Sequence, residues 1–326
     1  MLITSLMTGL IAGVLLANQI PINSHLQKSV VSPFKTVIIA YSVGVVFLIF
    51  LLSIAGQNLF VSSTVFSHQP LWLWTGGLLG AVYQTTNVVV FRKIGAVQTV
   101  VLPVFGQVLV STAIDTFGWF NSPVVKLTGI HLIGLFILIA GLIIAVGVSK
   151  QSEFEKTTVA KILDGDGTLT AERRGVWQVT LYRIASIFGG VSFGLQQAVN
   201  GKMGAAVGSP LQASLISYGI SAIGLIVVVL IVERSVLPSK ETFKLSKISP
   251  WTFLGGVFGS LAVVANISNV PHIGAGRNIL LVIIGQFVSA LVIQYFGLWS
   301  SIKKRVMVPQ YMGVAMMALG VFFLKF

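Results

Sequence analysis

The sequence predicts an all-α integral membrane protein in which ten transmembrane helices form two inverted five-helix repeats. Its mean hydropathy is +0.94 and only 9% of its residues are charged, whereas about a quarter are charged in soluble domains. Apolar runs close to the roughly 20 residues that cross a bilayer as a helix recur ten times along the chain. A polar pattern near the end of the first run also returns later without a gap.

The ten apolar runs define the expected helices in chain order. They start near Leu2, Phe34, Leu71, Ala96, Thr128, Gln178, Pro210, Trp251, Arg277 and Val308. Residues 2–17 could pass for a signal peptide, but they have no basic n-region and their repeat partner lies mid-chain, so we expect them to form the first helix. Stretches such as 227–232 do not alternate in polarity, which argues against a transmembrane barrel.

Local signals predict where two of these helices begin and how two others pack. Ser32-Pro33 and Ser209-Pro210 mark the starts of the second and seventh helices, because serine caps free N–H groups and proline suits the first helical position. GGLLG at 76–80 and GGVFG at 255–259 predict close backbone contacts in the third and eighth helices, since small residues let transmembrane helices approach each other.

An internal repeat relates the two halves of the chain. Residues 13–41 match residues 190–218 at nine of 29 positions with an offset of 177, and residues 76–118 match 255–297 with an offset of 179. Each copy holds five apolar runs, an odd number, so the second copy must enter the membrane in the opposite orientation. The expected units are residues 1–148 as the first repeat, 149–177 as a polar linker and 178–326 as the inverted second repeat.

The net charge of +13 is explained by membrane topology rather than by nucleic-acid binding. If the N-terminus lies outside, 17 of the 21 Lys and Arg residues fall on the cytoplasmic side, as the positive-inside rule requires. We therefore expect both termini outside, the basic linker in the cytoplasm, and the lipid bilayer around the chain. There is no cysteine, and the four histidines lack metal-ligand spacing, so neither thiol chemistry nor a metal site is expected.

One polar motif occurs once in each repeat. It reads G-(x)5-Q-(x)3-N followed by Ser-Pro and an aromatic residue, at Gly13, Gln19, Asn23, Ser32, Pro33 and Tyr41 and again at Gly190, Gln196, Asn200, Ser209, Pro210 and Tyr218. Over nearly the whole chain this pattern resembles the YdcZ-like family of the drug/metabolite transporter superfamily, in its fused two-repeat form. The resemblance implies a small-molecule carrier of the bacterial inner membrane, an exporter, and it implies no particular substrate.

The chain departs from one branch of that superfamily. The small multidrug resistance branch uses a glutamate in its first helix as a shared site for proton and cation. Neither the first nor the sixth expected helix contains a carboxylate here. The resemblance therefore does not carry proton-coupled cation efflux over to this sequence.

Polar residues inside the expected helices are the candidates for substrate binding or gating. They are Gln19, Asn23, Tyr41, Gln84, Asn87, Gln107, Gln196, Asn200, Tyr218, Asn266 and Gln286. Gln19 falls near the cytoplasmic end of the first helix and Gln196 near the outer end of the sixth, on opposite sides of the membrane, which suits paired gates, ligand contacts or fastening of the next turn. Gln107 and Gln286 fall near mid-helix, where they either bond across the repeat axis or line a cavity. Asn87 and Asn266 suit binding and structure equally well.

Asp115 is the only acidic residue inside an expected helix. A carboxylate within a membrane is costly, so Asp115 is a candidate for ion or substrate coupling. Its helix ends near Trp119, and its repeat partner is Gln294. The alternative is thus a structural residue at the outer interface.

Together these patterns predict a secondary carrier and no enzyme, because no acid, base and nucleophile occur together. Its two halves would alternate access to a mostly neutral site for a small polar or amphipathic metabolite. No cofactor is expected, and a monomer suffices because one chain holds both halves. The alternative is a membrane scaffold or assembly partner that transports nothing.

Overall fold

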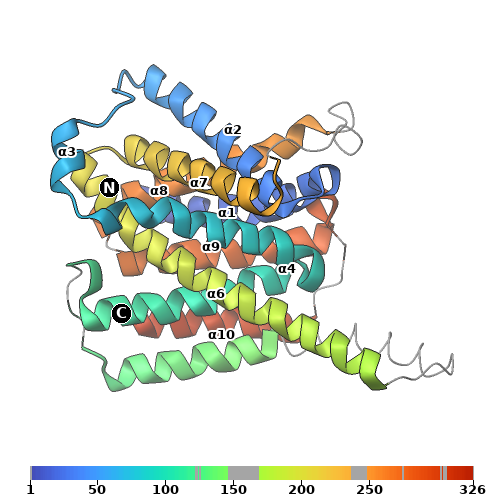
Figure 1. The fold of residues 1–326 in the computed structure, drawn as a ribbon. Helices are drawn as coiled ribbons and strands as arrows, with labels where there is room; N and C mark the ends of the chain where they lie inside the picture. The colour runs from blue at the N-terminus through green and yellow to red at the C-terminus, as the bar shows by residue number, and fades with distance from the viewer. Residues whose placement is uncertain are drawn as a thin grey trace.

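The computed structural model describes residues 2–121, 124, 126–145, 169–235, 248–273, 275–301, 303 and 307–325. Every regular element within these ranges is a helix. Figure 1 shows the helices lying side by side in a single bundle. The predicted all-α fold is confirmed.

The first half of the chain supplies the first five expected helices. It forms α1 (Leu2–Val30), α2 (Pro33–Ile54), α3 (Ser63–His68), the 3-10 turn η1 (Leu71–Thr75), α4 (Gly76–Phe117), η2 (Trp119–Asn121) and a helix over Gly129–Ala145. α4 contains two expected helices, because Gly95 interrupts it with φ 80° and ψ 175°. This backbone conformation is open to glycine, so the third and fourth expected helices meet at Gly95 without a loop.

The second half repeats this order. It forms α6 (Leu169–Val207), α7 (Pro210–Val232), η4 (Pro250–Phe253), α8 (Leu254–Ile273), α9 (Ala275–Phe296), η5 (Leu298–Ser300) and α10 (Val308–Lys325). α6 begins within the segment expected as a linker, and residues 146–168 lie outside the described ranges. The unit boundaries therefore stay predictions.

Length and composition agree with a membrane location. Five helical stretches in the described ranges are long and apolar enough to cross a bilayer, and three further apolar helices are shorter. The five include all of α2 and α7, whose 18-residue windows reach hydropathies of 2.8 and 2.7. Because α7 holds no charged residue and α2 holds only Lys35 in its first turn, they carry the clearest transmembrane signal.

The helix boundaries follow the predicted signals. Ser32 accepts a hydrogen bond from the backbone N–H of Lys35, and Ser209 accepts one from that of Gln212, each at 3.2 Å. Both predicted serine caps are thereby confirmed. At their C-terminal ends, α4 and α9 are each followed by a glycine in the left-handed backbone conformation, Gly118 and Gly297. The repeat is thus visible in the caps as well as in the sequence.

Glycines set the closest helix crossings, and the crossings come in mirrored pairs. A Cβ on Gly13 of α1 would lie 2.1 Å from the carbonyl oxygen of Val282 in α9. A Cβ on Gly190 of α6 would lie 1.9 Å from the carbonyl oxygen of Pro103 in α4. Because each pair is related by the repeat offsets, α1 crosses α9 as α6 crosses the second part of α4.

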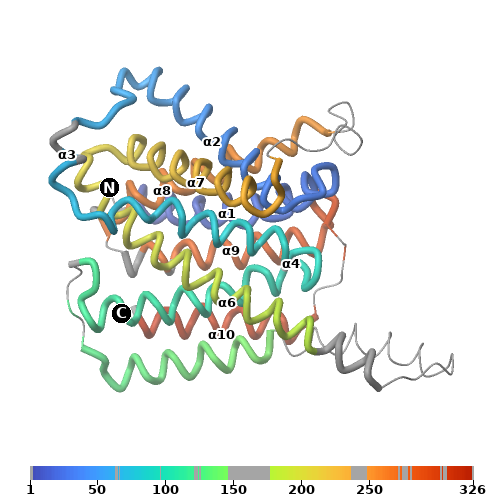
Figure 2. Tube along the Cα trace, in the orientation of Figure 1, coloured from blue at the N-terminus to red at the C-terminus, as the bar shows by residue number. Residues whose placement is uncertain are grey.

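The two halves interlock rather than stand apart. α1 packs mainly on α8 and α9 of the second half, α6 packs mainly on α4 of the first, and α2 packs on α7. Figure 2 shows the yellow-green α6 running alongside the teal and green α4. The first helix of each repeat is therefore embedded in the other repeat, which places the buried amides of α1 and α6 between the halves.

Candidate functional site

The predicted amides of α1 and α6 lie in grooves formed by the glycine motifs. Each amide faces one glycine of the opposite repeat: Gln19 faces Gly259, Asn23 faces Gly255, Gln196 faces Gly80 and Asn200 faces Gly76. In every pair, a Cβ on the glycine would come within 2.4 Å of the amide. The glycines are thus required by the amides, and these two predicted features are parts of one structure.

Only one of the two buried asparagines at these crossings has a side-chain partner. Nδ2 of Asn200 donates to Oγ of Ser217 at 3.1 Å. The repeat counterpart of Ser217 is Ala40, which offers no hydroxyl, and both polar atoms of Asn23 lack a hydrogen-bond partner. Since an unpaired buried polar group costs about 1–3 kcal/mol, Asn23 carries a cost at both polar atoms, whereas Asn200 carries it only at Oδ1.

The predicted tyrosine pair meets between α2 and α7. The rings of Tyr41 and Tyr218 contact edge to face with centroids 4.8 Å apart, and both side chains are buried. The Tyr41 hydroxyl lies beside the side chain of Ser221, while the Tyr218 hydroxyl lies at Gly259, beside Gln19. The two motif tyrosines therefore connect the helix pair to the amide of α1.

Tyr83 of α4 is a central residue that sequence reasoning missed. Its ring stacks on Phe193 of α6 with centroids 4.3 Å apart. Its hydroxyl lies beside the side chains of Asn87 and Gln286. The repeat counterpart of Tyr83 is Ala262, so a search for matched polar pairs passes over it; its place one turn before Asn87 was the available signal.

The two predicted asparagines of α4 and α8 have different surroundings. Asn266 belongs to a buried chain of amides: Asn278 Nδ2 donates to Asn266 Oδ1 at 2.9 Å, and Asn269 Nδ2 donates to Asn278 Oδ1 at 3.0 Å and to the Ser5 carbonyl oxygen at 2.8 Å. Asn87 is 1% exposed, and neither of its polar atoms has a hydrogen bond of good geometry. Equivalent positions thus carry a structural network in one repeat and an unpaired amide in the other.

The remaining predicted residues lie along α4 and α9. Gln84 and Gln107 are buried, and Nε2 of Gln107 has no hydrogen-bond partner. Gln286 faces Tyr83, and because Nε2 of Gln107 has no partner, Gln107 does not donate to Gln286 across the repeat axis. Asp115 is half-buried two turns beyond Gln107, close to the end of α4, and it has an interaction partner.

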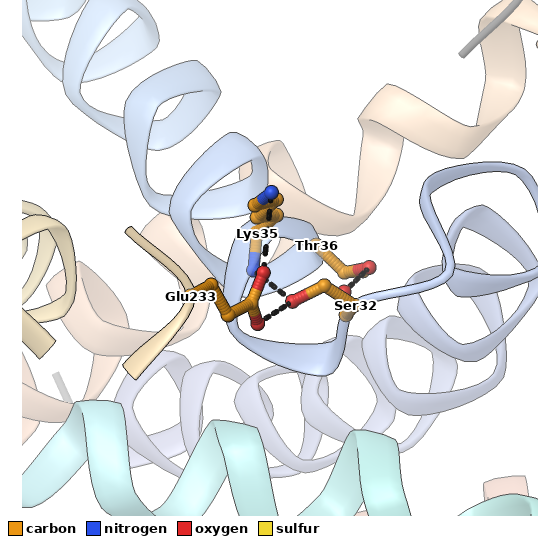
Figure 3. A network of polar contacts seen from close by, with 4 residues as sticks. All are labelled: Ser32, Lys35, Thr36 and Glu233. Atoms are coloured by element: carbon orange, nitrogen blue, oxygen red, sulfur yellow. Dashed lines mark hydrogen bonds and ion pairs between the residues drawn. The ribbon is translucent and has the colours of Figure 1, made fainter. Parts of the chain in front are cut away.

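A second polar feature joins the halves at one end of the α2–α7 pair, and Figure 3 shows it from close by. Glu233 follows α7 and lies at the N-terminus of α2. Its carboxylate accepts a hydrogen bond from Ser32 Oγ at 2.5 Å and pairs with Lys35 Nζ at 3.2 Å. We name Ser32, Lys35 and Glu233 the charged clasp.

The opposite end of the same pair carries a mirrored feature without charge. Ser209 Oγ donates to Gln57 Oε1 at 2.7 Å, and Gln212 Nε2 donates to the carbonyl oxygen of Asn58 at 2.6 Å. Ser209 and Gln212 are the repeat counterparts of Ser32 and Lys35. We name Ser209, Gln212, Gln57 and Asn58 the neutral clasp; sequence reasoning recognised its serine only as a helix cap.

The residues of the two clasps, the buried amides and the tyrosines can all bind a neighbouring helix or a ligand without forming a covalent bond. Within the described ranges, no three His, Cys, Asp or Glu side chains gather as a metal site would require. The chemistry available at the interface between the halves is therefore hydrogen bonding and aromatic contact, with one ion pair at its edge.

Comparisons with known proteins agree with this architecture. The family described as "Putative inner membrane exporter, YdcZ" matches residues 4–144 and 181–323, once in each half. A solved chain described as "Crystal structure of protein" superposes with a TM-score of 0.60 at 14% identity, covering 98% of this chain and 96% of that chain, which supports the fold alone. No curated protein matches. The chain belongs to the YdcZ family of the inner membrane, a family of transporters rather than enzymes.

Proposed function

We propose that this member of the YdcZ family is a secondary transporter that exports a small uncharged polar or amphipathic metabolite by alternating access. The observation that carries the proposal is the pair of clasps at opposite ends of α2 and α7. Each clasp joins the start of the second helix of one repeat to the end of the second helix of the other. Both clasps are formed here, which suits an occluded state.

The position of the clasps makes them suitable as gates. A rocking motion of one half against the other would separate the two helices at one end while leaving the other end closed. Hydrogen bonds between transmembrane helices contribute about 0.6 to 2 kcal/mol each. Hydrogen bonds of this strength would keep one end of the helix pair closed, and they are weak enough to break during each transport cycle.

The chemistry of the interior favours an uncharged substrate. The polar groups between the halves include the amides of Asn23, Asn87 and Gln107, and the hydroxyls of Tyr83 and Tyr218. None of these groups carries a charge that could neutralise an ion, and an ion within the membrane needs such a partner. Amides and phenols instead offer hydrogen bonds, while their aromatic and aliphatic neighbours accept apolar surface.

In this proposal the termini face outward and residues 1–148 and 178–326 are the moving halves. The charged clasp then lies at the cytoplasmic end, near the basic residues Lys28, Arg92 and Lys93, and the neutral clasp lies at the outer end. One chain contains both gates, so the monomer is the transporting unit. Asp115 remains a candidate for ion coupling, which transport by an Asp115→Asn variant would test.

Two matched cysteines test alternating access directly. The natural chain has no cysteine, so Thr36→Cys and Ala213→Cys each give a single probe. The two positions are repeat counterparts, both are 0% exposed, and each lies one turn inside a clasp. Labelling by a water-soluble maleimide should rise at one position when it falls at the other as transported metabolites are added.

The same experiment distinguishes the alternative function. A scaffold that transports nothing would leave both cysteines unlabelled under every condition. A metabolite library screened by thermal unfolding of the purified protein would supply the ligands for the labelling experiment, since a ligand that binds the folded state raises its midpoint.

A further inference from the structure

We propose that Asn87, Tyr83 and Gln286 form the substrate site and select a ligand with an uncharged planar amide or a similar adjacent donor and acceptor. This inference rests on the proposed transport function and names the substrate class of its site. It follows from a comparison between Asn87 and its repeat counterpart Asn266, which the same fold places in equivalent positions.

The second repeat uses its asparagine for structure. Asn266 accepts from Asn278, which accepts from Asn269, which also holds the start of α1 through the carbonyl oxygen of Ser5. This chain connects α8, α9 and α1. It therefore anchors three helices, and Asn266 has little capacity left for a ligand.

The first repeat has no amide at the positions equivalent to Asn269 and Asn278, the two residues that continue the hydrogen bonds from Asn266. The counterparts of Asn269 and Asn278 are Val90 and Thr99, and the Thr99 hydroxyl donates to the carbonyl oxygen of Gly95 within its own helix, at 2.7 Å. Asn87 is left 1% exposed, and its amide makes no hydrogen bond of good geometry, although the Tyr83 hydroxyl lies beside it. A buried carboxamide in this state is rare in native proteins, so Asn87 has donor and acceptor capacity available for a ligand.

The neighbours of Asn87 determine what this ligand would be. Tyr83 places its hydroxyl beside both Asn87 and Gln286, and its ring stacks on Phe193. A carboxamide offers one donor and one acceptor in a plane, which match the acceptor and donor of a second amide. The aromatic rings suit a flat group attached to that amide.

The site also spans both halves of the chain. Asn87 and Tyr83 belong to α4 of the first repeat, whereas Gln286 belongs to α9 and Phe193 to α6 of the second. A ligand held by these residues would be sensitive to the relative position of the halves. Binding at this site is therefore suited to control the opening of the clasps.

Three small probes of the same shape test the substrate class: benzamide, benzoate and benzamidine. The measurement is the thermal unfolding midpoint of the purified full-length protein at increasing probe concentration. We expect benzamide, which is neutral and carries the matching donor and acceptor, to raise the midpoint. Benzoate and benzamidinium should leave it unchanged, because the site would have to bury their charge without a partner.

Matched variants assign the effect to Asn87. Asn87→Leu removes an unpaired amide, so the ligand-free protein should unfold at the same or a higher temperature while benzamide binds at least tenfold more weakly. Asn266→Leu should lower the ligand-free midpoint and keep the benzamide response. Asn87→Asp should transfer the response from benzamide to benzamidinium, whose two N–H groups pair with a carboxylate.

The outcomes separate this inference from the proposed function. If wild-type protein fails to respond to benzamide, or Asn87→Leu responds as wild type does, the inference is overturned even when Thr36→Cys and Ala213→Cys are labelled reciprocally. If labelling is never reciprocal while benzamide binding still depends on Asn87, the transport mechanism fails and the binding site stands.

Discussion

The two ends of the α2–α7 pair share one framework and differ in their chemistry. Each end places the capping serine of one helix beside the end of the other, but Lys35 and Glu233 form an ion pair where the mirrored end has Gln212 and the Gln57–Asn58 segment. Glu233 also lies at the N-terminus of α2, where the helix dipole favours a negative charge. The comparison teaches that the repeat provides two equivalent clasp positions and that the residues at these positions make the clasps unequal.

The charged clasp should hold its end of the α2–α7 pair closed more strongly than the neutral clasp holds the other end. The charged clasp is partly shielded from water, with side-chain exposures of 12% and 24%, so its attraction is weakened less than that of a surface pair. The neutral clasp has no such contribution. In the proposed orientation the outer gate therefore opens at lower cost than the cytoplasmic gate, which suits release to the outside.

The two repeats also differ in the hydrogen bonding of their buried asparagines. Asn200 and Asn266 of the second repeat make side-chain hydrogen bonds, whereas the amides of their counterparts Asn23 and Asn87 make no hydrogen bond of good geometry. At these two pairs of positions, the second repeat uses its asparagine in a structural hydrogen bond, and the first repeat does not. Both contrasts are testable by substitutions that remove or exchange the differing groups.

The largest expected effect comes from breaking the framework that both ends share. Gly190→Leu would drive a side chain into the carbonyl group of Pro103, since even a Cβ would lie 1.9 Å from its oxygen. Overpacking of this kind typically costs about 1–3 kcal/mol and more where backbone must move. We expect little folded protein, measured as the monodisperse fraction in size-exclusion chromatography.

Gly219→Ala is the matched control for that substitution. Gly219 also lies in a transmembrane helix, and a Cβ there would meet no atom within 4 Å. This variant should yield as much folded protein as wild type. Equal yields from Gly190→Leu would contradict the mirrored close crossing.

The next largest effect should come from neutralising the charged clasp. Glu233→Gln keeps the shape and the contact with Ser32 but removes the ion pair with Lys35. We expect about tenfold faster labelling of Thr36→Cys, which corresponds to about 1.4 kcal/mol. Labelling of Ala213→Cys should not rise, because the neutral clasp is untouched.

Lys35→Gln and the double variant sharpen this result. If the ion pair is the relevant contact, each single substitution should have a similar effect, and combining them should add little. High salt should accelerate labelling in wild type more than in Glu233→Gln. Fully additive effects would show that the two residues act separately.

Much of the fold was predictable because it depends on local and repeated patterns. The serine caps follow from adjacent residues, and the inverted architecture follows from an odd number of helices in each copy. The boundary between the two expected helices within α4 was predicted near Ala96 and agrees with the break at Gly95, but the conformation that joins them without a loop was not predicted. A sequence shows a glycine there but does not show which torsion angles it adopts.

The sequence predicted mainly those residues of the candidate site that have a polar counterpart in the other repeat. Residues such as Gln19 and Tyr218 were found because each has a polar counterpart. Tyr83 has none, and the Ser32–Glu233 contact joins residues 201 positions apart, which no local pattern specifies. The amide–glycine pairing also needed the structure, since it depends on which helices of the opposite repeat pack together.

A smaller effect is expected from changing which of the motif asparagines, Asn200 or Asn23, has a hydroxyl as its hydrogen-bond partner. Ser217→Ala removes the hydroxyl that Asn200 bonds to and makes the second repeat resemble the first. We expect a loss of about 1 kcal/mol in the free energy of unfolding, typical of a hydrogen bond between membrane helices. Ala40→Ser offers Asn23 the missing hydroxyl and should restore part of that loss; a variant pair with no change in thermal midpoint would show that these contacts are immaterial to stability.

The smallest effect should come from the neutral clasp. Gln212→Ala removes one exposed hydrogen bond, to the carbonyl oxygen of Asn58 at 2.6 Å, and leaves the Ser209–Gln57 bond in place. A net contribution of about 0.5 kcal/mol is typical of such a bond, so labelling of Ala213→Cys should rise about twofold and labelling of Thr36→Cys should stay constant. Because no charge is involved, the increase should be the same at low and high salt. An effect equal to that of Glu233→Gln would mean that the two gates are alike despite their chemistry, and the proposed bias toward outward release would then lose its physical basis.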